Sequence, residues 1–257
     1  MAKYIAKPID SAGKIHFTEE EHGTWKLLIE RQEKIIQGRA CDEYIAGVKK
    51  LNFPQDRIPD IAEVSAGLSC TGWAVEPVSA IIPLKSFFEL IANRHFPVAT
   101  FIRVREELDY IKEPDIFHEY FGHCPLLTLP FYADFVQWYG QFALTMPEKL
   151  LPILGRLFWF TIEFGLIDTP QGLRIMGGGI LSSFAETQHC LENPKVERVP
   201  FDLSLVLGTD YNYWEIQKRY YVLRDFAQLV ELQNETLLRA ALASASPGKD
   251  PNMFRTC

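Results

Sequence analysis

The sequence Asp115-Ile-Phe-His118-Glu-Tyr-Phe-Gly122-His123-Cys-Pro125 lies in the most helical part of the chain and places two histidines five positions apart. On a regular α-helix, five positions rotate a side chain by about 500°, or about 140° net. Two rings so oriented could not reach one ion. Gly122 and Pro125 are typical of a helix end. We therefore expect the helix to break between residues 122 and 125, so that His123 turns back toward His118.

Two converging imidazoles are suited to a transition metal. Neutral histidine binds iron, zinc, copper or nickel, so the pair alone does not select the metal. Two unrelated histidines at the end of a core helix explain the pair equally well. The pair by itself leaves both interpretations open.

Glu163 is the best candidate for a third ligand. It stands in Trp159-Phe-Thr-Ile-Glu163-Phe164-Gly, where a carboxylate among apolar residues is unfavourable unless it is paired or binds a cation. Two histidines and one carboxylate on one face of an octahedron leave three positions open, as in iron(II) enzymes that bind oxygen. A structural ion pair is the alternative. The predicted metal ligands and catalytic residues are His118, His123 and Glu163.

The rest of the chain predicts one domain, residues 1–257, of the α+β class and predominantly helical. Apolar residues recur at helical spacing in residues 131–145 and 148–164. Thr18 predicts the start of the first helix. Further helices are expected at residues 42–51, 84–93 and 225–243, and after Ser183. Short strands are expected within residues 70–83 and at residues 98–104, 196–201 and 220–223. About residues 1–17 and 246–257 are expected to be peripheral tails.

Composition excludes several classes of function. The formal net charge of -7 over 257 residues opposes binding to nucleic acid, because phosphate contacts need clustered Lys and Arg. Gly177-Gly178-Gly179 lacks the lysine of a phosphate loop and the spacing of a dinucleotide site. No apolar run reaches the roughly 20 residues of a membrane helix. The five cysteines are scattered and indicate reduced thiols, so we expect a cytoplasmic protein.

Three blocks together resemble the signature of a known family. They are Pro114-Asp115-Ile-Phe-His118-Glu119 with the following Gly122-His123 and Pro125, then Trp159-Phe-Thr-Ile-Glu163-Phe-Gly, and finally Gly177-Gly-Gly-Ile-Leu-Ser-Ser183. In this order the blocks resemble the pterin-dependent aromatic amino acid hydroxylases. The similarity covers residues 21–223 and is greatest to the bacterial members that act on phenylalanine. It implies a catalytic-domain fold that is a basket of helices with a few short strands.

The resemblance also implies a chemistry. It implies that His118, His123 and Glu163 bind Fe(2+) and that a tetrahydropterin, either tetrahydrobiopterin or a bacterial equivalent, supplies two electrons. The implied activity is that of a phenylalanine 4-monooxygenase, which hydroxylates L-phenylalanine to L-tyrosine with O2. In such enzymes metal and cofactor carry the chemistry and the protein positions the parts. The residues that match the pterin site are Ile82, Phe87, Glu119 and Phe158. Of these, Phe87 is implied to stack on the pterin, although without the resemblance plain core packing explains it better.

Other residues match the substrate site of the family. Arg103 matches the arginine that binds the amino acid carboxylate, a role for which a planar guanidinium is well shaped. Asp115 matches the residue that orients this arginine. Glu186 matches an acid behind the pocket, while Ser183-Phe-Ala-Glu186 is an equally good capping box. The residues that match the pocket wall are Pro114, Trp159, Phe164, Gly179 and Ser182.

Two positions depart from the family pattern. Phe158 stands where relatives commonly carry Tyr, and Ala80 replaces a frequent Gly beside the pterin, so we expect altered pterin affinity or coupling. The sequence also shows no counterpart of the amino-terminal regulatory domain or the carboxy-terminal tetramerisation helix of animal relatives. We therefore expect a monomer or dimer without allosteric activation through such a domain.

Other functions fit part of the sequence. A zinc hydrolase could use the same three ligands with Glu119 as general base, although the five-residue histidine spacing differs from the four of the zinc-protease motif. A non-catalytic binding module could hold the histidines as core residues.

The preference for phenylalanine over tryptophan or tyrosine depends on the resemblance alone, since a few pocket methyl groups discriminate only modestly.

Overall fold

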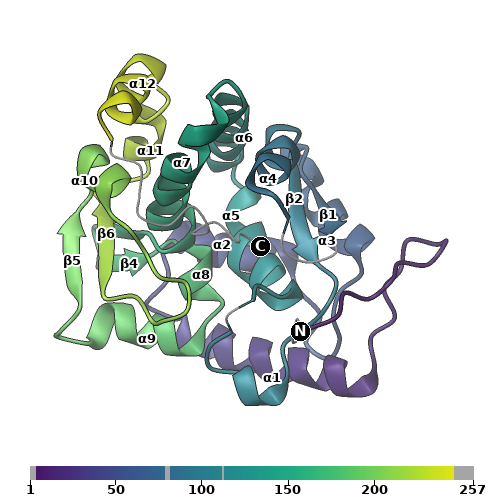
Figure 1. The fold of residues 1–257 in the computed structure, drawn as a ribbon. Helices are drawn as coiled ribbons and strands as arrows, with labels where there is room; N and C mark the ends of the chain where they lie inside the picture. The colour runs from purple at the N-terminus through teal and green to yellow at the C-terminus, as the bar shows by residue number, and fades with distance from the viewer. Residues whose placement is uncertain (1–3, 79–81, 112, 246–257) are drawn as a thin grey trace.

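The computed structural model describes residues 4–78, 82–111 and 113–245. Helices predominate and two small sheets accompany them, which confirms the predicted α+β class. The four-stranded sheet lies on one side of the molecule and the two-stranded sheet on the other (Figure 1). Between the sheets lie helical segments that include α6 (Pro130–Leu144) and α7 (Leu151–Phe158). Buried apolar side chains from all these parts form one continuous cluster.

Reciprocal side-chain caps mark the start of two of the first three helices. The three helices are α1 (Glu19–Ile35), α2 (Asp42–Leu51) and α3 (Ile61–Leu68). The Thr18 hydroxyl accepts from the Glu21 N–H, and the Glu21 carboxylate accepts from the Thr18 N–H, which confirms the predicted start of α1. Sequence analysis missed α3, although Asp60 and Glu63 form the same reciprocal cap.

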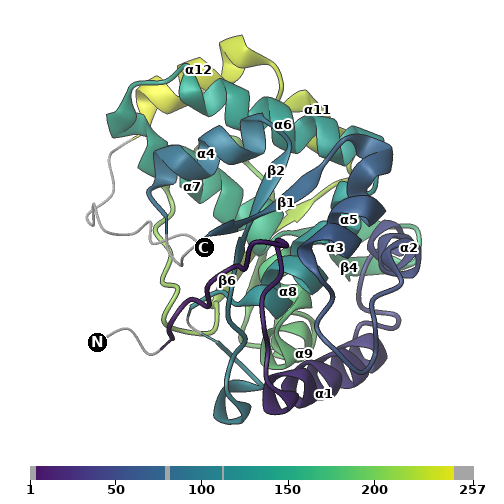
Figure 2. The ribbon, with the colours of Figure 1, turned by 90° about the vertical axis from the view of Figure 1, so that its right-hand side faces the viewer.

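The two-stranded sheet pairs β1 (Ala74–Val78) in parallel with β2 (His95–Ala99), and α4 (Leu84–Ala92) lies between them in the chain. Figure 2 shows α4 and α6 above this sheet. The strand predicted at residues 98–104 is wrong in its limits, because beyond Ala99 the backbone pairs with other segments. The Phe101 carbonyl accepts from the Ile116 N–H, and the Arg103 N–H donates to the Asp115 carboxylate.

The central helices run without the predicted break. They comprise the π-helix η3 (His118–His123), α5 (Cys124–Leu127), α6, the 3-10 turn η4 (Glu148–Leu150), α7 and the π-helix η5 (Trp159–Glu163). The break expected between residues 122 and 125 is wrong, since η3 passes directly into α5. Pro125 has no N–H to donate to the preceding turn, and the Phe121 carbonyl, four positions earlier, accepts from the Tyr44 hydroxyl. The helices predicted at residues 131–145 and 148–164 are confirmed, the second as three consecutive pieces. Two further 3-10 turns are η1 (Ser69–Thr71) and η2 (Arg105–Glu107).

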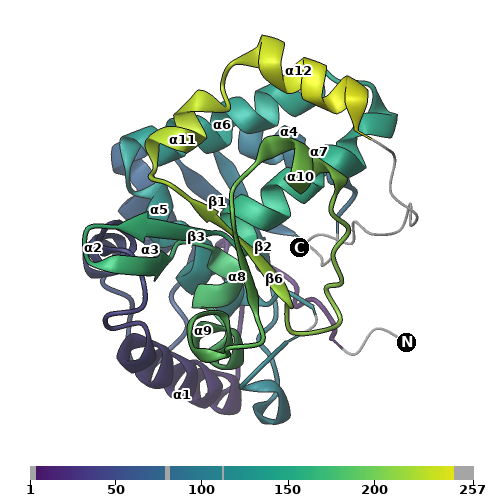
Figure 3. The same ribbon diagram turned by 90° about the vertical axis from the view of Figure 1, so that its left-hand side faces the viewer.

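The four-stranded sheet has the order β4-β3-β6-β5. Its strands are β3 (Leu166–Thr169), β4 (Gly172–Ile175), β5 (Glu197–Pro200) and β6 (Arg219–Leu223), and the helices between them are α8 (Gly178–Leu181), α9 (Phe184–Glu192) and α10 (Leu203–Gly208). Only the pair β3 and β4 is antiparallel. Figure 3 shows this sheet with α1 and α9 below it and α10 above. The strands predicted near residues 196–201 and 220–223 are confirmed.

The carboxy-terminal helix predicted at residues 225–243 is wrong as a single element. It is divided into α11 (Ala227–Glu231) and α12 (Glu235–Ser244). Asn234 begins the second helix, because its side chain accepts from the Leu237 N–H. The tail expected at residues 246–257 lies outside the described residues.

Among residues 4–78, 82–111 and 113–245, no helix combines the length and the apolar character needed to cross a membrane. The four cysteines described, Cys41, Cys70, Cys124 and Cys190, are all free thiols.

Gly47 tests how closely α2 packs on α5. A Cβ at Gly47 would lie 2.1 Å from the Pro125 carbonyl oxygen, whereas one at Gly208 meets nothing within 4 Å. We predict that Gly47→Ala lowers the free energy of unfolding by about 1 to 3 kcal/mol, because backbone must move to admit the methyl group. Urea denaturation with Gly208→Ala as the matched control measures this difference. Equal stability of the two variants would contradict the tight packing.

Candidate metal centre

The two histidines meet because residues His118–His123 are wound as a π-helix. In this winding the N–H of one residue pairs with the carbonyl five positions earlier, so residues five apart lie one above the other. The Nε2 atoms of His118 and His123 are 3.2 Å apart. The predicted convergence is therefore present, but a change of helical pitch produces it rather than the predicted helix end.

Glu163 reaches the same point from a second π-helix, η5. Its Oε1 atom lies 3.2 Å from His123 Nε2 and 3.8 Å from His118 Nε2. All three side chains are buried, with 3 to 7 % of their residue surface exposed. Burial opposes ionisation of Glu163, but the imidazoles of His123 and His118 hold the pKa of this carboxyl well below its usual range. Two imidazoles and a carboxylate thus surround one point in the core.

A single metal ion fits these donors. Two ligands, each about 2.1 Å from one ion, lie about 3.0 to 3.4 Å apart for angles between a right angle and a tetrahedral one. The observed separations of 3.2, 3.2 and 3.8 Å come close to this range. The ligand atoms of these three residues all lie within 4.8 Å of one another. Two imidazoles with one carboxylate is the donor set of open-sided iron(II) sites.

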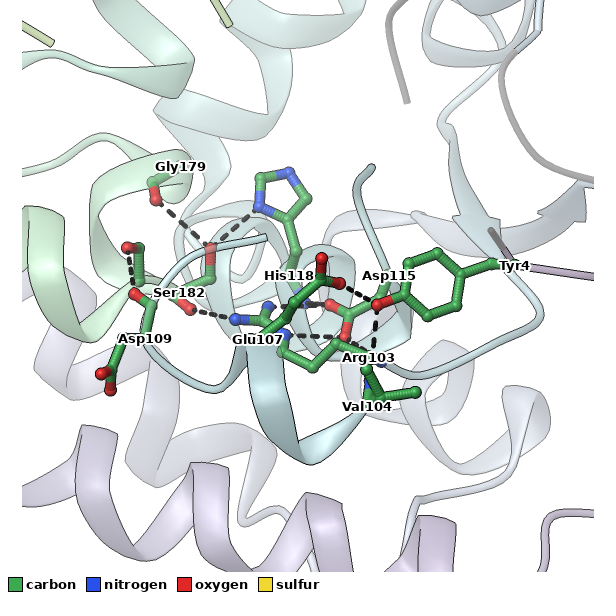
Figure 4. Close-up of polar contacts among 10 residues, drawn as sticks. Tyr4, Arg103, Val104, Glu107, Asp109, Asp115, His118, Gly179 and Ser182 are labelled. Atoms are coloured by element: carbon green, nitrogen blue, oxygen red, sulfur yellow. Dashed lines mark hydrogen bonds and ion pairs between the residues drawn. The ribbon is translucent and has the colours of Figure 1, made fainter. Parts of the chain in front are cut away.

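Ser182 holds the first histidine in the orientation that such a site requires. Its hydroxyl lies 2.8 Å from His118 Nδ1, so the other ring nitrogen, Nε2, faces His123 and Glu163. A hydrogen bond at one imidazole nitrogen fixes the tautomer and directs the second nitrogen to the metal. Figure 4 shows this contact beside the Gly179 carbonyl, to which the same hydroxyl donates at 3.4 Å.

The glycine run gives the ligands their space. A Cβ at Gly178 would lie 2.6 Å from the His123 ring, and one at Gly179 would lie 2.8 Å from the Glu163 carboxylate. At Gly177 it would lie 2.3 Å from the Glu163 carbonyl oxygen. The sequence excluded phosphate binding by these glycines, and the family resemblance placed Gly179 in the pocket wall, but this close packing against the ligands was not predicted. The run of three, in the same block as Ser182, which contacts His118, was the signal that could have revealed it.

A buried ion pair lies beside the metal ligands. Arg103 Nε and Nη2 donate to the two carboxylate oxygens of Asp115 at 2.8 and 2.9 Å, and both side chains are fully buried. Asp115 also accepts from the backbone N–H of Arg103 and of His118. Burial would raise the pKa of Asp115, but Arg103 outweighs burial and holds the pKa below its usual range. Arg103 Nη1 lies 3.4 Å from the Ser182 carbonyl (Figure 4).

Aromatic rings stack on Trp159. The Trp159 ring lies between Phe164, at a centroid distance of 4.4 Å, and Tyr211, at 4.1 Å. Its indole N–H donates to the Gln217 side chain at 3.3 Å. Sequence analysis missed Tyr211 and Gln217, because they lie far along the chain in a segment without regular periodicity. Pro114, at the start of the Asp115 loop, is half-buried.

The four residues predicted to contact a pterin lie in or next to the core. Phe87 is 1 % exposed, and its ring packs edge-on against Phe158 at 5.1 Å. The Phe158 ring in turn lies 6.4 Å from that of His123. Glu119 is buried on the π-helix next to His118, and Ile82 is half-buried against the core. Ala80, where altered pterin binding was expected, lies outside the described residues.

Glu186 is fully buried behind the aromatic stack. Its carboxylate accepts from the Gln217 N–H at 2.9 Å and from the Tyr220 hydroxyl. Burial raises the pKa of Glu186 to about 7, although both bonds oppose this. The capping box predicted for it is half wrong, since the Ser183 hydroxyl accepts from the Glu186 N–H while the carboxylate bonds to distant residues instead.

Comparison with known proteins agrees with this geometry. Residues 3–237 match the family model described as biopterin-dependent aromatic amino acid hydroxylase. The phenylalanine-4-hydroxylase of Pseudomonas aeruginosa is 48 % identical over 237 residues, which cover 92 % of this chain and 90 % of the relative.

Solved structures give the same result. The cold-active phenylalanine hydroxylase of Colwellia psychrerythraea superposes with a TM-score of 0.90 at 47 % identity, over 93 % of both chains. The enzyme of Chromobacterium violaceum with bound iron(III) and oxidised 7,8-dihydrobiopterin gives 0.85 at 42 % identity, over 92 % of this chain and 88 % of the other. This chain belongs to the family of biopterin-dependent aromatic amino acid hydroxylases.

Proposed function

We propose that this protein is a phenylalanine 4-hydroxylase, which converts L-phenylalanine to L-tyrosine with O2 and a tetrahydropterin. The observation that carries the proposal is the buried convergence of His118, His123 and Glu163 in a chain of this family. The substrate is inferred from relatives named phenylalanine-4-hydroxylase at 43 to 48 % identity. The iron and pterin are supported by the Chromobacterium violaceum structure that contains both.

His118, His123 and Glu163 would hold Fe(2+). When bound, iron and tetrahydropterin supply the activation of O2. The chain's own part is to fix three donors on one side of the ion, so that positions remain for other ligands. Ser182 maintains the His118 tautomer that this requires. Burial of the ligands excludes bulk water from the reacting groups.

Arg103 is proposed to bind the substrate carboxylate. Asp115 takes one N–H each of Nε and Nη2, and the Ser182 carbonyl accepts from Nη1 at 3.4 Å. The second N–H of Nη1 and of Nη2 can then donate to a second carboxylate. Because Asp115 also bonds to the His118 N–H, the substrate clamp and the metal ligand share one support. The proposed wall of the side-chain pocket is Pro114, Trp159, Phe164, Gly179 and Ser182, with Glu186 behind it. The proposed contacts of the pterin are Ile82, Phe87, Glu119 and Phe158.

Two alternatives are less well supported. The π-helix removes the spacing argument against a zinc hydrolase, since it brings both histidines to one point. Family membership still argues against that activity. Hydroxylation of tryptophan would need only a different pocket shape, and a substrate panel with a tetrahydropterin distinguishes the tryptophan from the phenylalanine activity.

We further propose that the protein acts in the cytoplasm as a monomer or dimer.

Removal of any metal ligand is predicted to abolish activity. His118→Ala, His123→Ala and Glu163→Ala should each lose both iron binding and tyrosine formation, because two donors hold the ion poorly. Metal analysis after loading with iron(II), together with chromatographic detection of tyrosine, measures both effects. His16→Ala, a replacement of an exposed histidine, is the control. Activity retained in the ligand variants, or hydrolysis by a tightly held zinc ion, would refute the proposed function.

Replacement of Arg103 is predicted to weaken substrate binding specifically. Arg103→Lys keeps a charge beside the buried Asp115 but loses the planar fork. We expect the KM for phenylalanine to rise about 10- to 100-fold, the range of one charged hydrogen bond, while the KM for the pterin stays unchanged. Steady-state kinetics with each substrate varied in turn measures the two constants. An unchanged KM for phenylalanine would remove Arg103 from this role.

Gly178→Ala is predicted to damage the metal site without removing a ligand. The new methyl group would lie 2.6 Å from the His123 ring and must displace it. Disturbed support of a metal ligand weakens metal affinity by about 10- to 100-fold, and we expect a loss of this size in iron titrations. Gly208→Ala, where a methyl group meets nothing, should bind iron normally. Normal iron affinity in Gly178→Ala would show that the ring has room to move.

A further inference from the structure

The amino-terminal residues lie along the segment that carries Arg103. The Lys7 N–H donates to the Thr100 carbonyl at 3.3 Å, and the Thr100 hydroxyl donates to the Lys7 carbonyl at 2.9 Å. The Tyr4 ring stacks on Phe101, with a centroid distance of 4.6 Å and an angle of 9° between the ring planes. Residues 4–7 thus contact residues 100–101 through backbone and side chains.

The Tyr4 hydroxyl extends this contact past Arg103. It accepts from the Val104 N–H at 3.4 Å and donates to the Glu107 carboxylate (Figure 4). Burial and the Glu107 charge raise the pKa of Tyr4 well above its usual value, so the hydroxyl stays protonated and remains a donor. Tyr4 therefore holds the chain on both sides of Arg103, at Phe101 and at Val104.

The opposite side of the same segment is held by the start of the metal-binding turn. Asp115 binds the Arg103 backbone and side chain, and the Ile116 N–H donates to the Phe101 carbonyl at 2.9 Å. The backbone from Phe101 to Val104 is thereby fixed between Tyr4 and the Asp115 loop. Figure 4 shows two groups of polar contacts, one around Tyr4 and one around Arg103 and Asp115. They meet where Arg103 and Val104 follow each other in the chain.

We propose that Tyr4 is a positioning residue for substrate recognition, which acts through Arg103 and fixes the guanidinium for the carboxylate of the amino acid. This inference rests on the proposed function. A donor that is held in its bound geometry before the ligand arrives spares the cost of ordering it on binding. Arg103 has no rigid helix or sheet of its own, because β2 ends at Ala99. The contacts at Phe101 and Val104 take the place of such an element.

Tyr4→Phe and Tyr4→Ala separate the two contacts, because the first removes the hydroxyl bonds and the second also removes the stack. For Tyr4→Ala we expect the Kd and KM for L-phenylalanine to rise about five-fold, because the Arg103 side chain must then be ordered when the ligand binds, with a smaller rise for Tyr4→Phe. The kcat and the KM for tetrahydropterin should remain unchanged. Calorimetric titration with L-phenylalanine and steady-state kinetics measure these values.

Two controls separate positioning from general stability. Asp10→Ala removes bonds to the Ala12 and Lys14 N–H groups within the same segment and should leave the binding of L-phenylalanine unchanged. In an Arg103→Lys background, Tyr4→Ala should add no further rise in Kd, because residues that act through one contact are not additive. An additive effect, an unchanged Kd in both Tyr4 variants, or an equal loss in Asp10→Ala would overturn the inference. If the unsubstituted protein forms no tyrosine, the proposed function fails, while the titration still tests Tyr4.

Discussion

The winding of residues His118–His123 is the constraint on which the site depends. An α-helix would direct these two rings to different sides, whereas hydrogen bonds over five residues put them on the same side. The second π-helix, which ends at Glu163, delivers the carboxylate in the same way from α7. The glycines at positions 177 to 179 then let a third segment approach these ligands. Each element leaves its regular geometry at the place where it meets the others.

The buried carboxylates of this region, Asp115 and Glu163, are a second constraint on its structure. A buried carboxylate is tolerated only with partners, and Asp115 satisfies this with four donors from Arg103 and His118. Glu163 faces two imidazoles instead. The two acids thus differ in their neighbours. Asp115 is paired with a permanent cation, Arg103, whereas Glu163 lies beside two imidazoles that can bind the same metal ion. The Arg103–Asp115 ion pair and the three metal ligands therefore lie side by side, joined by the bond from the His118 N–H to Asp115.

Local signals in the sequence predicted much of the helical framework. Thr18 with Glu21 predicted the start of α1, and apolar periodicity predicted α2, α4 and α6 within a residue or so of their limits. The prediction of a break at Gly122 and Pro125 was wrong, because residue preferences do not reveal that a helix can change to the wider turn of a π-helix. The strand at residues 98–104 was misplaced because its backbone partners, Ile116 and Asp115, come from a distant loop. Among the metal ligands, the unfavourable burial of Glu163 was readable from its apolar neighbours. The stack of Tyr211 on Trp159 was not, since it joins residues 52 positions apart in sequence.

Ser182 touches both halves of the site, its hydroxyl at His118 and its carbonyl at Arg103. In the proposed function, a substrate carboxylate at Arg103 would therefore bind next to the residue that sets the tautomer of a metal ligand. By thermodynamic linkage, whatever factor phenylalanine imposes on the affinity for iron, iron must impose on the affinity for phenylalanine. Ser182 is the contact through which any such coupling between the two sites would act.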